Sequence, residues 1–237
     1  MRLCLSIRDS FVIFCAALTL VGCGNRAANE KTPEEIPQPE YGQEESNVEL
    51  WLETMELGSR EIYAARNEVV KAVGLKPGDR VADIGAGTGL HTLLFAEKVG
   101  ADGAVFAVDI EPKFLKLINQ RSADNDYSNV TAVLGRDNSI TLPENEVDVV
   151  FISDTYNYFE DPEAIIKSVY TALRPNGYLI VLDFDIVEGV ERTPDNQHIR
   201  IGKEAVASEI ERVGFVLDQE VDVPGLEATY MLRFQRQ

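Results

Sequence analysis

The sequence predicts an α/β protein: a doubly wound, mostly parallel seven-stranded sheet with helices on both faces and an antiparallel C-terminal hairpin. From about Val48 onward the pattern is regular: short segments that are apolar throughout alternate with helical patterns, which is typical of parallel strands covered on both faces. Only Pro224-Gly225 and its neighbours separate the last two predicted strands, which favours a hairpin at the sheet edge. The length of 237 residues, without an internal repeat, favours a single domain.

The predicted elements follow the chain in a regular order. Ile62, Val69 and Val73 fall on one face of a helix over 61–73, which Gly74 ends. A proline in its first turn begins the helix at Pro112. Strands are expected at residues 80–85, 104–109, 130–134, 147–152, 178–183, 215–221 and 229–234. The remaining helices are expected at residues 90–99, 112–122, 162–173 and 203–213.

The chain is strongly acidic, because 40 Asp and Glu residues outnumber 22 Lys and Arg residues and give a net charge of −18. Hydrophobic residues make up 45% and charged residues 26%, which excludes a disordered, collagenous or multi-pass membrane chain. A field of this sign repels phosphate backbones and anionic lipid headgroups. We therefore expect no nucleic-acid partner.

The N-terminus has the pattern of a secretory signal. Arg2 and Arg8 precede an apolar run over 11–21, which is too short to cross about 30 Å of hydrocarbon as a helix. The end of this run, Leu20-Val21-Gly22-Cys23, resembles the bacterial lipobox, in which the chain is cleaved before a cysteine that carries lipid. The resemblance implies a signal peptide over 1–22 and a membrane anchor at Cys23.

Residues 24–47 are polar, acidic and interrupted by three prolines. Such a segment cannot bury enough apolar surface to offset its conformational entropy, which predicts a disordered tether. The expected organisation is a signal peptide over 1–22, the lipidated Cys23 with its tether over 23–47, and a folded domain over 48–237. This organisation would place the domain in the bacterial cell envelope, on the periplasmic side or the cell surface.

Cysteine and histidine counts restrict the chemistry. The three cysteines, Cys4, Cys15 and Cys23, all precede the folded domain, and the only histidines are His91 and His198. These numbers exclude a disulfide framework, a Cys–His dyad and a zinc site of the usual Cys/His kind. We expect no metal.

Polar residues and glycines gather where the predicted strands end, which is where doubly wound sheets bind ligands. Asp83 lies inside an apolar strand, and Gly85, Gly87 and Gly89 follow it at every second position, so the backbone can turn sharply and approach a ligand. The spacing differs from the Gly-x-Gly-x-x-Gly of dinucleotide sites, which disfavours an NAD-dependent oxidoreductase. A structural carboxylate that caps the loop amides is the alternative for Asp83.

Two further acids end the second and third predicted strands. Asp109, twenty residues beyond Gly89, can accept both hydrogen bonds of a ribose diol. Asp137 could accept a hydrogen bond from an exocyclic amine, although by itself it is an ordinary turn residue.

Together these residues resemble the class I S-adenosylmethionine-dependent methyltransferases, from about Arg60 to Arg233. The resemblance implies that Asp83, Gly85, Gly87 and Gly89 form the first cofactor motif, that Asp109 binds the ribose and that Asp137 contacts the adenine. Residues 142–152 and 173–183 are similar to the family's fourth strand and its entry into the fifth. A Gly-Gly pair is usual before that fifth strand. Asn176 replaces one of these glycines, and asparagine tolerates the left-handed conformation that a turn may need.

The acceptor side is expected after the fourth strand. Asp154 could orient or deprotonate an acceptor, and Tyr156 and Tyr158 could line the pocket, although aromatic packing is the alternative for both tyrosines. His198 is a candidate base or substrate contact in a polar loop after the fifth strand. The Asp/Asn-Pro-Pro-Tyr motif of amino-methylating relatives is absent, which disfavours base or glutamine methylation, and the missing cysteines argue against arsenite methylation.

Tyr63 and Arg66 lie on the helix before the first strand, where many relatives close a lid, although surface exposure is the alternative. His91 follows the glycine loop and is expected to pack rather than to act as a base. We expect a membrane-anchored enzyme that transfers methyl groups from S-adenosylmethionine to a small-molecule or exported acceptor. A lipid-anchored protein that binds a nucleoside ligand without catalysis is the alternative, because fold does not fix function.

Overall fold

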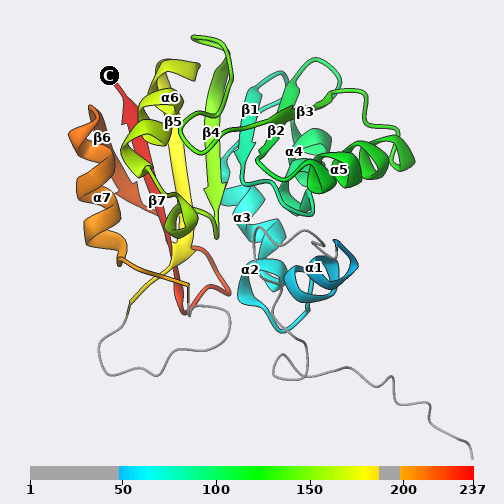
Figure 1. Ribbon diagram of the computed structural model, residues 1–237, viewed down its shortest axis with the longest axis horizontal. Helices are drawn as coiled ribbons and strands as arrows, with labels where there is room; N and C mark the ends of the chain where they lie inside the picture. The colour runs from blue at the N-terminus through cyan, green and yellow to red at the C-terminus, as the bar shows by residue number, and fades with distance from the viewer. Residues whose placement is uncertain (1–47, 187–197) are drawn as a thin grey trace, which may run out of the picture. The chain divides into compact units, whose positions relative to one another are not determined.

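The computed structural model describes residues 48–186 and 198–237 (Figure 1). Every described residue belongs to one compact unit. The predicted signal peptide, Cys23 and the tether lie outside the described residues. Within the described ranges, every helix is too short or too polar to span a bilayer.

The central sheet has seven strands in the order β3-β2-β1-β4-β5-β7-β6, which confirms the predicted fold class. Five strands run parallel, and β7 pairs antiparallel with both β5 and β6, so the C-terminal hairpin forms one edge as predicted. The strands are β1 (Arg80–Ile84), β2 (Ala104–Asp109), β3 (Val130–Leu134), β4 (Val147–Ser153), β5 (Leu173–Phe184), β6 (Phe215–Glu220) and β7 (Thr229–Arg236).

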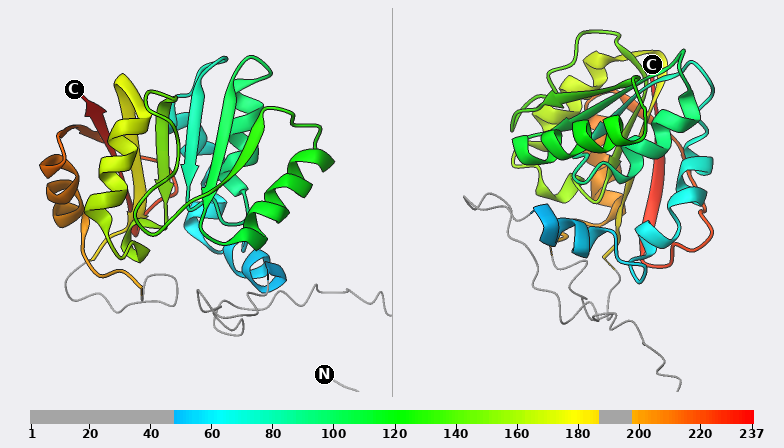
Figure 2. Two further views of the ribbon diagram at one scale, coloured as in Figure 1. Left: turned by 45° about the horizontal axis from the view of Figure 1, so that its top comes forward. Right: turned by 90° about the vertical axis from the view of Figure 1, so that its right-hand side faces the viewer.

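Helices cover both faces of this sheet. The side chains of α3 and α4 pack in one apolar cluster and those of α6 and α7 in another, on opposite sides of alternating strand residues such as Phe151 and Ile152. The right-hand view of Figure 2 shows the cyan α3 and the yellow-green α6 on opposite sides of the sheet. The helices are α1 (Val48–Met55), α2 (Glu61–Ala64), α3 (Arg66–Val73), α4 (Leu90–Val99), α5 (Pro112–Asp124), α6 (Pro162–Ala172) and α7 (Lys203–Arg212), with a 3-10 turn η2 (Tyr156–Tyr158).

Three elements differ from the sequence-based prediction. The helix predicted over 61–73 is broken at Ala65, whose dihedral angles of −88° and 5° separate α2 from α3. Strand β5 starts at Leu173, five residues earlier than predicted, because this segment already pairs with β4. The third difference is helix α1, which was not predicted.

Asn176 has a φ of +64°, which confirms the left-handed conformation expected of it.

The strand register brings the ends of the parallel strands to one edge. Ile84 lies opposite both Val108 and Ile152, and Ser153 lies opposite Leu182. The residues that follow β1, β2, β4 and β5 therefore meet at the carboxyl edge of the sheet. Helices α1 and α2 lie beside this edge, below the arrowheads of the parallel strands in Figure 1.

Candidate functional site

A cavity of about 520 Å³ opens at the carboxyl edge of the sheet. Its volume falls within the roughly 300–1,000 Å³ of small-molecule and cofactor sites. Its lining comes from the ends of β1, β2 and β4, the loop after β3, the N-terminal helices and the segment at His198. The lining residues include Trp51, Met55, Arg60, Gly85, Gly87, Asp109, Phe114, Asp137, Asp154, Tyr158, Glu160 and His198.

The loop after β1 leaves no room for side chains beside the cavity. Gly85 has a φ of +68°, and a Cβ atom added there would lie 2.3 Å from Thr155 Cγ2. Gly87 has a φ of +51° and would place a Cβ atom 3.3 Å from Met55 Cε. Both glycines line the cavity, whereas Gly89 begins α4 and packs against Ile118. Two of the three predicted glycines thus lie on the cavity wall.

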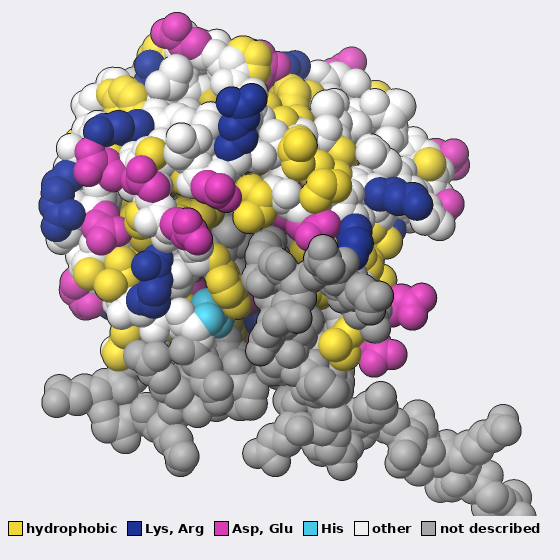
Figure 3. All heavy atoms as spheres, viewed as in Figure 1, with side chains coloured by type: hydrophobic (Ala, Val, Ile, Leu, Met, Phe, Trp, Pro, Cys, Tyr) yellow, Lys and Arg dark blue, Asp and Glu magenta, His cyan; other side chains and the backbone are white. Residues whose placement is uncertain are grey.

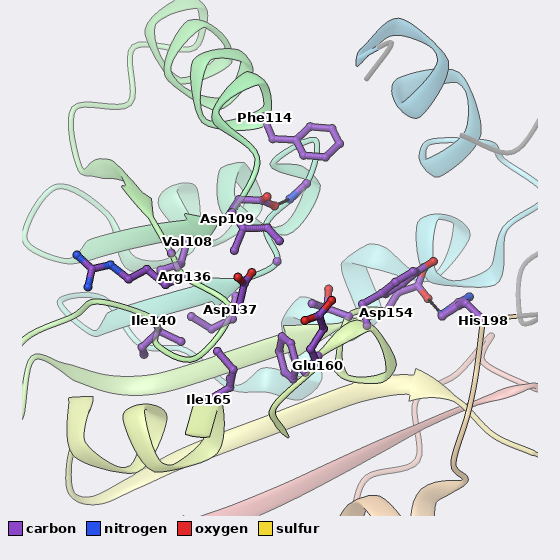
Figure 4. A pocket seen from close by; sticks show the side chains of 18 of the residues that line it. Val108, Asp109, Phe114, Arg136, Asp137, Ile140, Asp154, Glu160, Ile165 and His198 are labelled. Carbon is purple, nitrogen blue, oxygen red and sulfur yellow. Dashed lines mark hydrogen bonds and ion pairs between the residues drawn. The ribbon is translucent and has the colours of Figure 1, made fainter. Parts of the chain in front are cut away.

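Asp109 joins this loop to the end of β2. The carboxylate is 2% exposed, and its Oδ2 accepts a hydrogen bond of 2.9 Å from Gly87 N while its Oδ1 accepts one of 2.9 Å from Glu111 N. The side chain lines the cavity (Figure 4). The two backbone hydrogen bonds fix the orientation of a carboxylate at the position that the sequence predicted for a ribose contact.

Asp83 lies beneath the loop and is not one of the lining residues. Its Oδ2 accepts a hydrogen bond of 2.6 Å from Thr92 Oγ1, which links β1 to α4. Burial raises the pKa of Asp83 to about 7; the Thr92 hydroxyl opposes this rise and the charge of the nearby Asp109 contributes to it. The structure therefore favours a structural role for Asp83 over the predicted cofactor contact, because its carboxylate accepts a hydrogen bond from α4 and does not line the cavity.

Asp137 lies in the loop after β3 and lines the cavity beside Ile140. Its side chain is exposed at the rim, and Figure 4 shows the carboxyl groups of Asp109 and Asp137 on the same side of the cavity. This end therefore combines two acids with an apolar wall of Val108, Ile110 and Phe114.

Helix α1 forms a wall that the sequence analysis missed. Trp51 and Met55 line the cavity, and the Trp51 ring meets the Phe114 ring edge-on at 5.9 Å. Arg121 of α5 fastens the helix end, because its Nη1 donates to Glu56 Oε1 at 2.5 Å and to Thr88 O at 2.8 Å. The sequence carried one signal for this wall, the single tryptophan of the chain. A Trp that follows a polar segment indicates packing against an apolar partner.

Asp154 and His198 form the other end of the cavity (Figure 4). Asp154 follows β4 with a φ of +49°, a conformation that is strained for a residue with a Cβ atom. Its Oδ2 accepts a bond of 2.6 Å from Arg60 Nη2, and its Oδ1 lies 3.1 Å from His198 Nε2. The His198 ring stacks on Tyr158 at 4.5 Å. The predicted acceptor residues Asp154, Tyr158 and His198 are therefore neighbours.

Asp183, at the end of β5, lies behind this group and was not predicted as a site residue. It is fully buried, and its Oδ1 accepts a hydrogen bond of 2.8 Å from Phe184 N. Burial raises the pKa of this carboxyl group to about 7, and the neighbouring charge of Asp154 adds to the effect.

Three residues that the sequence analysis considered for the pocket lie away from the cavity, whereas His91 packs as predicted. Tyr156 is fully buried in the core and its hydroxyl donates to Glu209 Oε2 at 2.9 Å, so it does not line the cavity. Arg66 stacks over the Tyr63 ring at 4.3 Å and neither residue reaches the cavity, so α1 and Arg60 occupy the position expected for a lid. His91 is buried among aromatic rings, as expected of a packing residue, and burial lowers its pKa to about 4.

The fold and the site define a class of protein. A doubly wound sheet whose first loop is rich in glycine, with a buried acid ending the second strand beside it, is the arrangement of nucleoside-cofactor domains. A family model described as "Methyltransferase domain" matches residues 75–233. The chain belongs to this family of S-adenosylmethionine-dependent methyltransferases, as the resemblance implied.

Individual relatives agree with this assignment. The chain is 35% identical to a ubiquinone/menaquinone biosynthesis C-methyltransferase of Ectopseudomonas mendocina over 116 residues, which cover 48% of this chain and 45% of the relative. It is 29% identical to an arsenite methyltransferase of Halobacterium salinarum over 149 residues, 61% of this chain and 37% of the relative. The matched segment thus spans about half or less of these relatives.

Solved structures share the fold. An S-adenosylmethionine-dependent methyltransferase from Aquifex aeolicus superposes with a TM-score of 0.69 at 23% identity, covering 78% of this chain and 97% of that chain. A crystal structure of a possible exported protein from Bordetella parapertussis has a TM-score of 0.60 at 15% identity, over 73% of this chain and 67% of that chain.

Proposed function

We propose that this protein transfers a methyl group from S-adenosylmethionine to a small-molecule or exported acceptor while anchored to a bacterial membrane through Cys23. One observation carries the catalytic part. A single cavity has the Asp109 carboxylate and the glycine loop at one end and Asp154 with His198 at the other. Cofactor and acceptor would therefore meet in one enclosed space.

The residues of the first end fit the cofactor. Gly85 and Gly87 let the backbone of the loop form the cavity wall against which the methionine part would lie, and Asp109 presents its carboxylate to the same cavity from the end of the neighbouring strand. Trp51 and Phe114 supply flat apolar surface for a base. When bound, the cofactor supplies an activated methyl group on a positively charged sulfur. The acids around the cavity favour that positive charge.

The residues of the second end would receive the acceptor. Tyr158 and Phe159 line this part and can hold an apolar body, while Asp154 and His198 can orient its nucleophilic atom and take up its proton. Arg60 holds Asp154 from the other side, so the carboxylate keeps one orientation. Catalysis then comes from in-line positioning and exclusion of water by α1 and Tyr158.

The test of catalysis uses the full chain, S-adenosylmethionine with a labelled methyl group, and fractionated extracts of the cell envelope as the source of acceptors. We expect formation of S-adenosylhomocysteine that requires an extract fraction and falls at least tenfold in His198→Gln, with cofactor binding intact. The variant Asp102→Asn, in an exposed turn far from the site, is the matched control. Cofactor binding without turnover in any fraction would support the non-catalytic alternative instead.

The anchoring proposal rests on the lipobox-like sequence and the polar segment that follows it. Mass spectrometry of the membrane-extracted protein should find a chain that begins at a lipid-modified Cys23. A chain that retains an unmodified Met1 would refute this part of the proposal and leave the catalytic part unaffected.

Charge supports the choice of acceptor class. On the face in Figure 3, Lys and Arg side chains stand singly among acidic and apolar ones, without a continuous basic surface. A nucleic-acid acceptor would require such a surface.

A further inference from the structure

Three polar atoms without hydrogen bonds converge at the acceptor end of the cavity. They are Asp154 Oδ1, Asp183 Oδ2 and His198 Nε2. One potential ligand atom from each of these three residues lies within 4.8 Å of the other two. Among the described residues, none of the three makes a hydrogen bond, and all are shielded from solvent. Asp154 Oδ1 and His198 Nε2 are 3.1 Å apart and pair with each other only when Nε2 carries a proton, whereas Asp183 Oδ2 has no partner in the described part of the chain in either case. Leaving a buried polar atom unpaired costs about 1–3 kcal/mol, so this cluster indicates that a further group belongs there.

Asp183 is the strongest indication. The residue is fully buried at the end of β5, where one oxygen accepts a hydrogen bond from Phe184 N and the other is buried without a hydrogen-bond partner among the described residues. The two remaining atoms come from different segments, Asp154 after β4 and His198 far along the chain. The set therefore does not arise from one turn or one acidic run in the sequence.

The donor set and its geometry suit a metal ion. Two ligands about 2.1 Å from a tetrahedral ion lie roughly 3.4 Å apart. The observed separation between Asp154 Oδ1 and His198 Nε2 is 3.1 Å. One imidazole with two carboxylates favours Zn²⁺ or Mn²⁺, since imidazole is a weaker partner for Mg²⁺ and Ca²⁺. Three protein ligands leave a coordination position open, as in catalytic rather than structural sites.

The local charges are compatible with a cation. Arg60 engages Asp154 through Oδ2 and leaves Oδ1 unused. Two carboxylates and one guanidinium give a net charge of −1 around a neutral His198, and a divalent ion would change it to +1. An acceptor bound as an oxygen anion would then bring the site to neutrality.

We infer that Asp154, Asp183 and His198 bind a divalent transition-metal cation at the acceptor end of the cavity. This cation site goes beyond the sequence analysis, which expected no metal. Its consequence for substrate class rests on the proposed function: the cation would bind a hydroxyl group of the acceptor and lower its pKa, so that the hydroxyl proton leaves to water. The oxygen atom would then form a bond to the methyl carbon while the bond from that carbon to the cofactor sulfur breaks, which leaves S-adenosylhomocysteine. With the cation bound, Asp154 and His198 act as its ligands and no longer as proton acceptors. The competing arrangement is a proton on Asp183 that is shared with Asp154.

The test is a titration of the EDTA-treated full chain with Mn²⁺, followed by the electron paramagnetic resonance signal of the free ion. We expect one tightly bound Mn²⁺ per chain, displaced by Zn²⁺. Affinity should fall at least tenfold in Asp183→Asn and in His198→Gln and stay unchanged in Asp102→Asn. Asparagine keeps the shape of Asp183 and can still accept from Phe184 N, and His198→Gln provides a second variant if the first fails to fold.

Binding of S-adenosylmethionine is measured on the same samples, so that the two proposals can fail separately. A wild-type chain that binds the cofactor but retains neither Mn²⁺ nor Zn²⁺ would overturn the cation site and leave the proposed function standing. Mn²⁺ binding that is equal in the wild type, Asp183→Asn and His198→Gln would also overturn it. Site-dependent Mn²⁺ binding in a chain that does not bind the cofactor would support the cation site and refute the proposed function.

Discussion

The substitution Gly85→Ala tests whether the loop after β1 is as tightly built as the structure shows. Two costs combine at this residue. An alanine at a φ of +68° is destabilised by about 1–2 kcal/mol. Its Cβ atom would also lie 2.3 Å from Thr155 Cγ2 and 2.4 Å from Thr155 Oγ1, and relieving such overpacking costs about 1–3 kcal/mol. We expect the free energy of unfolding to fall by about 2–5 kcal/mol.

Thr155→Ala separates the two costs. It removes the two atoms that clash, leaves the Thr155 Cβ 2.9 Å from the new Cβ atom, and loses the hydrogen bond of 2.7 Å from Thr155 Oγ1 to Ser153 O. In urea denaturation of the two single variants and the double variant, the double should therefore be more stable than additivity predicts, by about 1–2 kcal/mol. Additive effects would refute the contact, and a harmless Gly85→Ala would refute the whole account of this loop.

Three other changes have defined outcomes. Because burial raises the pKa of Asp83 from its ordinary value of 3.8 to about 7, the contribution of Asp83 to stability should fall as the pH rises from 4 to 7, by about 3 kcal/mol between pH 5 and pH 8; Asp83→Asn should remove this fall. Urea denaturation at pH 5 and pH 8 checks this, and parallel pH profiles would contradict it. Asn176→Ala should lose about 1 kcal/mol of stability while Asn176→Gly loses none, because φ is +64°; equal losses would count against a left-handed turn. Arg121→Gln frees α1 from α5 and should weaken S-adenosylmethionine binding by about 1 kcal/mol, roughly fivefold, in calorimetry, and unchanged affinity would exclude α1 as part of the site.

The sheet could be predicted from the sequence because its strands are continuous apolar runs and its turns carry Gly, Pro and Asn. Because both faces of such a sheet are apolar, helices must cover them. The alternation of strands and helices along the chain then determines how the parallel strands are connected. Asp109 and Asp137 could be placed for the same reason, since Asp109 ends β2 and Asp137 lies in the loop after β3, at the carboxyl edge of the sheet.

The misplaced residues depend on packing that no local pattern contains. Tyr156 and Tyr158 are separated by one residue in a 3-10 turn, and only the fold decides that the first enters the core and the second borders the cavity. Asp183 looked like an ordinary strand end, because its partners Asp154 and His198 come from other segments. Helix α1 is a single short amphipathic segment whose partner, Phe114, lies about sixty residues away, so its role appears only in three dimensions.

The most direct test of the central claim is a calorimetric titration of the full chain with S-adenosylmethionine and S-adenosylhomocysteine. Both ligands should bind, and Asp109→Ala should weaken both by about 1–3 kcal/mol, the scale of lost hydrogen bonds to a charged group, while Asp102→Asn binds like the wild type. A folded wild-type chain that binds neither ligand, or an Asp109→Ala variant with unchanged affinity, would contradict the assignment of this cavity as the cofactor site.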